Sequence, residues 1–197
     1  MNNYWSQYQR CLMQALASSQ VTDAEGQTLD AEVAVQRLCE LTLSVRDARR
    51  TIHFVGNGAS ACMASHMAVD WTKNAGVRSL AYNDLAFLTA IGNDLGYDQT
   101  FSQPINWFGE PGDLLATISS SGNSPNVVNA AAVARQKGLI LVTFSGMKPD
   151  NKSRRAGDLN FYVPATTYGF VECAHQVLLH TWLDCYMNVR EWDTTPR

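Results

Sequence analysis

The sequence has no apolar run of membrane-spanning length, and its first residues lack the basic stretch and apolar core of a secretory signal peptide. It also lacks a strong charge of either sign, because 15 Lys and Arg stand against 18 Asp and Glu, for a formal net charge of −3. This balance gives no electrostatic attraction for nucleic acid or for an anionic membrane. We therefore expect neither as a partner.

Cysteine motifs are absent as well. The five cysteines are odd in number, scattered along the chain and without a CxxC pair. This pattern fits reduced thiols in the cytoplasm better than a disulfide framework or a thiolate zinc site. With 197 residues, 46% hydrophobic and 17% charged, we expect one globular domain over residues 1–197, with residues 1–50 as an N-terminal helical extension.

Short apolar runs alternate with helical patterns along the chain. The first 50 residues predict two helices joined by a polar connection over residues 22–29. Strands are then expected at residues 51–56, 113–119, 139–145 and 159–164, and helices at residues 60–74, 125–137 and 171–189. Near-continuous apolar strands separated by helices indicate parallel strands buried on both faces. The sequence predicts an α/β fold, a three-layer doubly wound sandwich with a mainly parallel, flavodoxin-like sheet that binds ligands beyond the carboxyl ends of its strands.

A cluster of serines follows the second of these strands. In "ISSSGNSP", one hydroxyl suffices to cap the following helix, and Ser124 before Pro125 suits that position. The other hydroxyls, beside a helix N-terminus, favour a binding site for a phosphate monoester. A serine-rich turn with a cap is the alternative. The four serines are Ser119, Ser120, Ser121 and Ser124.

The stretch "GNGAS", Gly56 to Ser60, forms a similar corner after the first of these strands. It matches neither GxGxxG nor a Walker A loop. Its two glycines allow backbone amides to approach a ligand closely, but a plain tight turn explains them equally well.

Ionisable residues with helical spacing follow. His66 and Asp70 are four positions apart and share one helix face, either as an exposed ion pair or as part of a site. Glu172, His175 and His180 lie on the last predicted helix, where each histidine could equally be a hydrogen-bonded structural residue. We expect His53, inside a strand, to be such a residue.

Three motifs in order, "GNGAS", "AIGNDLGYDQTFSQPI" and "ISSSGNS", resemble the sugar isomerase (SIS) family of phosphosugar-binding domains, and within it the phosphoheptose isomerases. The likeness extends from about Gln36 to Met187. It implies that the four serines hold a sugar phosphate. It also implies a sugar-binding set comprising Asn57, Gly58, Ala59, Ser60, Asn93, Asp94 and Glu172. Ala59 stands where the family usually has a glycine.

The resemblance further implies aldose–ketose isomerisation through an enediol, assisted by a divalent metal, first of all zinc. Its metal ligands would be His66, Asp70, Glu172 and His180, with Asp70 as the base and His180 as the acid. Asp70 replaces a family glutamate and is one methylene shorter. Glu172 replaces a glutamine and adds a negative charge beside any metal.

Helix geometry bears on this ligand set. Eight helical residues rise about 12 Å, which is too far for Glu172 and His180 to share one ion easily. Either Glu172 leans inward from a frayed helix start, or the two residues come from different subunits of the tetramer that the resemblance implies. His66, Asp70 and His180 with water would already form a catalytic zinc shell.

The expected function is therefore a cytoplasmic homotetrameric isomerase. It would convert sedoheptulose 7-phosphate into D-glycero-D-manno-heptose 7-phosphate for the heptose of lipopolysaccharide or capsule. Two alternatives stay open. One is an isomerase of another phosphosugar, and the other is a non-catalytic SIS protein that binds protein partners.

Overall fold

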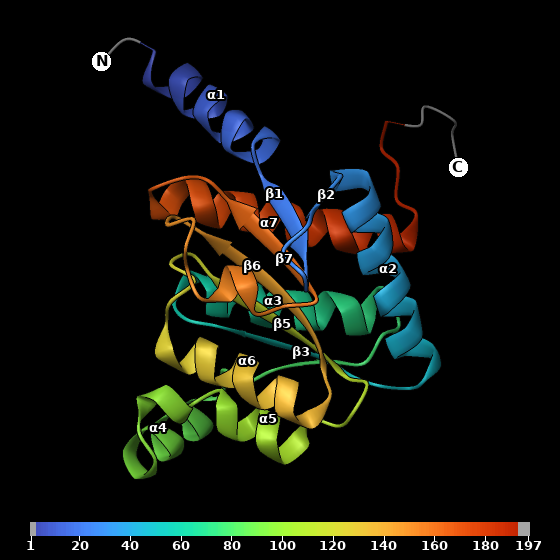
Figure 1. The fold of residues 1–197 in the computed structure, drawn as a ribbon, viewed down its shortest axis with the longest axis vertical. Coiled ribbons are helices and arrows are strands. Elements are labelled where there is room, and N and C mark those ends of the chain that lie inside the picture. Colours follow the sequence, from blue (N-terminus) through green and yellow to red (C-terminus); the bar gives the residue numbers. More distant parts are fainter. Residues whose placement is uncertain (1–2, 193–197) are drawn as a thin grey trace.

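A seven-stranded sheet lies at the centre of the computed structural model, which describes residues 3–192 (Figure 1). The strand order is β2-β1-β7-β6-β5-β3-β4. The run from β7 to β4 is parallel, whereas β1 pairs antiparallel with β7 and β2 pairs antiparallel with β1. The strands are β1 (Gln20–Asp23), β2 (Thr28–Leu29), β3 (Ile52–Gly56), β4 (Ser79–Ala81), β5 (Leu114–Ser119), β6 (Ile140–Gly146) and β7 (Leu159–Val163).

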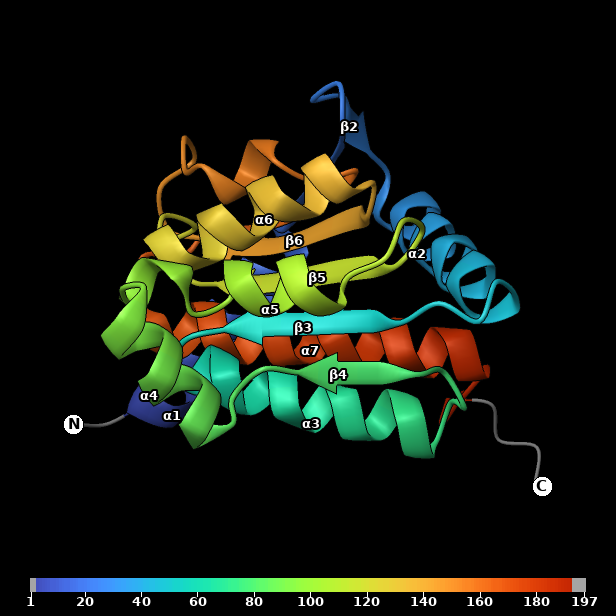
Figure 2. The same cartoon turned by 90° about the horizontal axis from the view of Figure 1, so that it is seen from below.

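Helices cover both faces of this sheet. The α-helices are α1 (Tyr4–Ala17), α2 (Ala31–Asp47), α3 (Ala59–Lys73), α4 (Leu85–Asp94), α5 (Ser102–Phe108), α6 (Pro125–Lys137) and α7 (Tyr168–Met187). Two 3₁₀ turns, η1 (Tyr97–Gln99) and η2 (Ser153–Arg155), interrupt the connections. Helices α2, α3 and α7 pack on one face, and α5 and α6 pack on the other. Figure 2 shows α3 and α7 running alongside each other beneath the sheet.

Alternation along the central strands explains the two layers. Ile52 and Phe54 of β3 join the core with α2, α3 and α7, whereas Val55 joins the core with α5 and α6. Since successive strand residues point to opposite faces, a strand that is apolar at almost every position must be covered on both sides. The predicted three-layer α/β sandwich is thereby confirmed.

One prediction about the N-terminal region is wrong. Residues 22–29, expected to be a polar connection, belong to the β1–β2 hairpin. Asp23 stabilises its turn, because Oδ1 accepts hydrogen bonds from the amides of Glu25 (3.1 Å) and Gln27 (2.8 Å), and Gly26 supplies the positive φ of 80°. Strands β1 and β2 are too short and polar to produce a strand pattern in the sequence. Strand β1 forms because it pairs with β7.

Helix α1 extends away from the sheet, and of its side chains only Ala15 is buried (Figure 1). Tyr8 of α1 packs on Phe170 of α7, with ring centroids 4.7 Å apart. Across residues 3–192, no helix combines the length and apolarity that crossing a membrane requires. The five cysteines are free thiols, as predicted.

Candidate functional site

The serine cluster lies at the carboxyl end of β5, at the corner that leads into α6. Gly122 has a φ of 62°, and its amide donates to the Ser119 carbonyl at 3.0 Å, which closes the turn. Ser119 and Ser120 are buried, and Ser121 and Ser124 are partly buried. The structure therefore brings the four predicted serines together in one loop, residues 119–124, which we call the serine loop.

Two hydroxyls of the serine loop have no role in the fold itself. Ser124 occupies the N-cap position of α6, yet its side chain makes no capping hydrogen bond. The Ser120 hydroxyl is buried and has no partner among the described residues. A cap alone therefore does not account for the cluster. Buried hydroxyls without partners cost free energy unless a ligand or water satisfies them.

A neighbouring segment supports the serine loop from below. The Ser153 amide donates to the Gly122 carbonyl at 3.0 Å, and the Lys152 amide donates to Asn123 Oδ1 at 3.1 Å. Asn151 is buried directly against Gly122, where a Cβ would lie 2.0 Å from Asn151 Oδ1. Only glycine fits there, so the loop has a fixed shape.

The "GNGAS" corner is built just as tightly. A Cβ on Gly56 would lie 2.7 Å from the Ser60 Cβ and 2.8 Å from the Ile118 carbonyl, so β3 can meet β5 only through glycine. Gly58 has a φ of 57° and precedes α3, which begins at Ala59. The Ala59 side chain is exposed, so the alanine at this position causes no crowding.

A hydrogen-bonded bridge, which no sequence motif indicates, joins these two corners. Asn57 and Asn126 exchange two side-chain hydrogen bonds of 2.9 Å, and the Tyr97 hydroxyl donates to Asn57 Oδ1 at 3.1 Å. Asn93 and Asp94, at the end of α4, are exposed and hydrogen-bond to each other at 2.8 Å. They precede Tyr97 by only a few residues.

A second cluster lies between α3 and α7. Within the described residues, His66, Asp70 and His180 form a group whose potential ligand atoms all lie within 4.8 Å of one another. His66 Nε2 is 3.3 Å from Asp70 Oδ2, and the side chains of these two residues are 50% and 19% exposed. Asn74 Nδ2 donates to the other carboxylate oxygen of Asp70 at 3.3 Å. The spacing on α3 therefore produces the contact expected of it, and α7 adds the second imidazole.

The donor set suits a small divalent cation. Two imidazoles and one carboxylate, with a fourth position left for water, are a common shell of catalytic zinc. Donor atoms of a tetrahedral zinc site lie roughly 3.3 Å apart, so modest rotations of partly exposed side chains would close this group around an ion.

Glu172 is not part of this group. It lies near the start of α7, two turns before His180, in accordance with the helical rise that separates them. His175 is fully buried, and its Nε2 donates to the Ser145 carbonyl at 3.0 Å. Burial lowers the pKa of His175 to about 4, and this hydrogen bond opposes the shift. His175 is therefore a structural residue.

His53 is also structural, as expected. Its Nε2 lies 3.0 Å from Asp113 Oδ2 and its Nδ1 lies 2.7 Å from the Tyr82 hydroxyl, all buried. Burial alone would raise the pKa of Asp113. Hydrogen bonds from His53 and from the amides of Thr51 and Glu110 outweigh burial and lower it. Burial, and then the charge of Asp113, raise the pKa of Tyr82.

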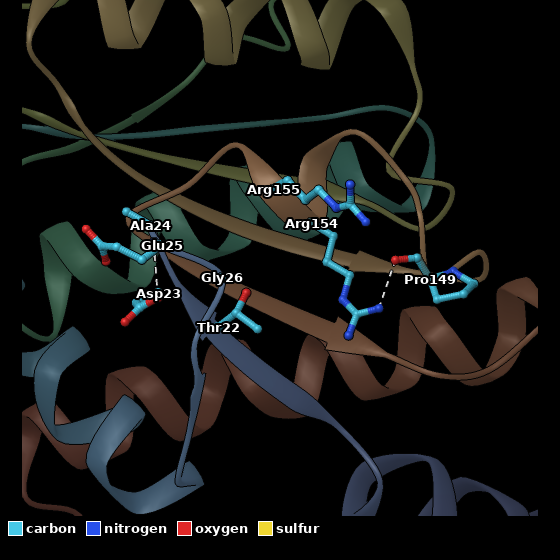
Figure 3. A pocket seen from close by; sticks show the side chains of 8 residues that line it. All are labelled: Thr22, Asp23, Ala24, Glu25, Gly26, Pro149, Arg154 and Arg155. Atoms are coloured by element: carbon cyan, nitrogen blue, oxygen red, sulfur yellow. Dashed lines mark hydrogen bonds between the residues drawn. The ribbon is translucent and has the colours of Figure 1, made fainter.

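A cavity of about 410 Å³ lies elsewhere, beside the β1–β2 hairpin (Figure 3). Arg154 crosses it and is already engaged, donating to the Pro149 carbonyl at 2.8 Å and stacking over the Tyr162 ring at 4.0 Å. Asp23 is engaged within its own turn. Arg154 and Asp23 are thus engaged within the chain, and the cavity is lined by none of the predicted site residues.

Comparisons with known proteins agree with this geometry. Curated relatives named phosphoheptose isomerase include one from Nitratidesulfovibrio vulgaris, 40% identical over 123 residues, which are 59% of this chain and 59% of the relative. The alignment thus spans less than two thirds of that relative. Another, from an Enterobacter species, is 36% identical over 140 residues, which are 68% of this chain and 72% of the relative.

Solved structures show the same relationship. A phosphoheptose isomerase from Neisseria gonorrhoeae superimposes with a TM-score of 0.79 at 30% identity, covering 92% of this chain and 96% of that one. One from Francisella tularensis has a TM-score of 0.80 at 20% identity, covering 94% and 97%, and shows the shared fold. The SIS domain family matches residues 20–146, which include the serine loop, the "GNGAS" corner and the His66–Asp70 pair. The chain belongs to the SIS domain family.

Proposed function

We propose that this protein is a phosphoheptose isomerase, an aldose–ketose isomerase that converts sedoheptulose 7-phosphate into D-glycero-D-manno-heptose 7-phosphate. The observation that carries the proposal is the group of His66, Asp70 and His180, in a chain 36–40% identical to proteins of that name. A scaffold that only binds other proteins has no need for two imidazoles and a carboxylate within reach of one another. Their presence favours the catalytic alternative.

The serine loop would hold the phosphate of the substrate. The Ser124 hydroxyl, which makes no capping hydrogen bond, and the buried, unpartnered Ser120 hydroxyl support this assignment. Neutral hydroxyl donors at a helix N-terminus bind a dianion well. The remaining predicted contacts would line the sugar. They are Asn57, Gly58, Ala59, Ser60, Asn93, Asp94, Ser119, Ser121 and Glu172.

Proton transfer would fall to Asp70 and His180. Asp70 removes a proton from C1 of the ketose while His180 donates a proton to the oxygen on C2, which gives a neutral enediol. Asp70 then returns its proton to C2, and the hydroxyl proton on O1 passes to His180, which leaves an aldehyde at C1. Both groups regain their starting protonation. His66, 3.3 Å from Asp70, orients the carboxylate.

The same residues fit a zinc ion, with His66, Asp70 and His180 as ligands. A bound zinc would polarise the substrate carbonyl. Asp70 has two carboxylate oxygens and His180 has two ring nitrogens, so one atom of each can face an ion while the other exchanges a proton. We further propose a cytoplasmic homotetramer, built from a single SIS domain with residues 1–50 as its extension, acting in surface heptose synthesis. In such an assembly Glu172 can serve a neighbouring subunit as a ligand or substrate contact.

The test is product formation by the purified protein. Sedoheptulose 7-phosphate is incubated with the enzyme, with and without a chelator, and the aldose is detected by NMR through its anomeric proton. We expect turnover that the chelator abolishes and added zinc restores. Arabinose 5-phosphate and fructose 6-phosphate serve as comparison substrates. Faster turnover of either would establish the other-phosphosugar alternative. No turnover of any of the three would refute the isomerase assignment.

A further inference from the structure

Asn126 uses its whole side chain within the fold. It is the second residue of α6 and is 1% exposed. Its Nδ2 donates to Asn57 Oδ1 at 2.9 Å and to Thr100 Oγ1 at 3.1 Å, and its Oδ1 accepts from Asn57 Nδ2 at 2.9 Å and from the Val127 amide at 3.0 Å. An asparagine amide can make four such bonds, and all four are made.

The partners of Asn126 belong to the other chain segments around the candidate site. Asn57 lies in the "GNGAS" corner, 69 positions away. Thr100 is fully buried, and its hydroxyl donates to the Tyr97 carbonyl at 2.8 Å. The Tyr97 hydroxyl in turn donates to Asn57 Oδ1 at 3.1 Å. Asn126 is thus the point at which the corners after β3 and β5 and the η1 turn are tied together.

Two parallel bonds between two side-chain amides fix distance and orientation more strictly than one bond does. The backbone before Asn126 is also restrained, because Pro125 has a fixed φ. The serine loop leads directly into this proline. A shift of the serine loop relative to Asn57 would break at least one buried hydrogen bond. A buried amide left unpaired costs free energy, so such a shift is disfavoured.

We propose that Asn126 is a positioning residue that sets the separation between the serine loop, which holds the phosphate, and the "GNGAS" corner, which lines the sugar. This inference rests on the proposed function, and it adds a residue that acts through Asn57. Asn126 is buried and saturated with hydrogen bonds, so it has none left for substrate. Substitution of Asn126 should misplace the sugar while the serine loop still holds the phosphate.

The test uses Asn126→Asp, which keeps the size of the side chain. The carboxylate still accepts from Asn57 Nδ2 but presents its second oxygen to Asn57 Oδ1, where a donor is needed. We expect KM for sedoheptulose 7-phosphate to rise roughly tenfold, with the inhibition constant of inorganic phosphate unchanged. As the pH falls and the introduced carboxyl takes up a proton, the ratio of variant to wild-type kcat/KM should recover, because the protonated group donates again.

Asn129→Ala is the matched control. Asn129 lies one turn further along α6 and donates to the Asp98 carbonyl of η1 at 3.0 Å without contacting Asn57. Its KM should stay within twofold of wild type. Asn126→Ala, alone and with Asn57→Ala, gives a second measurement, since two residues that act as one unit have non-additive effects on KM.

Three outcomes would overturn the positioning role. They are an unchanged KM in Asn126→Asp, a parallel loss of phosphate affinity and melting temperature, and additive effects in the double variant. Failure of the proposed function is recognised separately, because the wild-type protein would then turn over none of the phosphosugars.

Discussion

His66 of α3 and His180 of α7 meet edge to face, with ring centroids 5.3 Å apart and ring planes inclined by 64°. The two helices are joined beneath them by Trp71 and Trp182, whose rings are 4.7 Å apart and fully buried. Packing therefore fixes the position of the imidazoles from below, while the imidazoles themselves face outward. Substitutions in the cluster should change the chemistry with little effect on the fold.

Asp70→Asn tests this separation of chemistry from stability. The amide has the size of the carboxylate but cannot take up a proton at neutral pH, so kcat should fall by about 10²- to 10⁴-fold. The melting temperature should stay within about 2 °C, because the pair with His66 is partly exposed and contributes little. Kinetics with sedoheptulose 7-phosphate and thermal unfolding by circular dichroism measure both.

The control for this substitution is Asp47→Asn. Asp47 is an exposed aspartate at the end of α2 that pairs with Arg46. The substitution removes the same charge outside the His66–Asp70–His180 group, so kcat should be unaffected. Wild-type kcat in Asp70→Asn would rule out Asp70 as the base.

Zinc binding should depend on the two imidazoles of the cluster. We expect about one zinc ion per chain in the wild type after loading and dialysis. His66→Ala and His180→Ala should each lose most of it, because a two-ligand site binds zinc far more weakly than a three-ligand site. Metal analysis of the dialysed proteins gives the stoichiometry without any activity assay.

His175→Gln is the matched control for the metal analysis, since it replaces a histidine of the same helix that is buried away from the group. It should retain zinc. Full zinc content in both alanine variants would exclude this group as the metal site.

Local sequence patterns sufficed to predict the sheet with its two covering layers of helices. They also predicted the His66–Asp70 part of the cluster. The apolar runs of β3, β5, β6 and β7 fix two covered faces, because a strand without alternation cannot be left open on one side. His66 and Asp70 are four apart on α3, and helical spacing alone brings them together. Three motifs in order then indicated the family.

What could not be predicted depends on contacts between distant residues. The approach of His180 to His66 requires α7 to pack on α3, and the Asn57–Asn126 pair spans 69 positions. The β1–β2 hairpin, β4, α4 and α5 are short elements whose conformation tertiary pairing decides. Glu172 matches a family position by spacing, yet the helix places it outside the cluster.

The serine loop yields a contrast between neighbouring substitutions. Ser121→Ala removes a partly buried hydroxyl whose bond within the fold is a 3.3 Å contact from the Asn123 amide. KM should therefore rise several-fold with stability preserved. Gly122→Ala should instead cost about 2 kcal/mol or more of unfolding free energy, because the methyl group would meet Asn151 at a positive φ.

Urea unfolding and steady-state kinetics of both variants check the contrast. Ser44→Ala, an exposed serine within α2 whose hydroxyl bonds only to its own helix, should change neither quantity. A stability loss in Ser121→Ala with normal KM would indicate that the serine loop is a structural turn and not a phosphate-binding site.

His175 should make stability depend on pH between neutrality and pH 5. Burial lowers its pKa from 6.5 to about 4, so the folded protein keeps it neutral while the unfolded chain takes up a proton below about pH 6.5. The stabilisation is therefore complete above that pH and is lost as the pH falls toward 4. Between pH 7 and pH 5 this amounts to about 2 kcal/mol. Urea unfolding at both pH values should show that the free energy of unfolding falls less in His175→Gln than in the wild type, by that amount. Glutamine can still donate to the Ser145 carbonyl but does not titrate, so equal losses in the two proteins would show that His175 is not the group responsible.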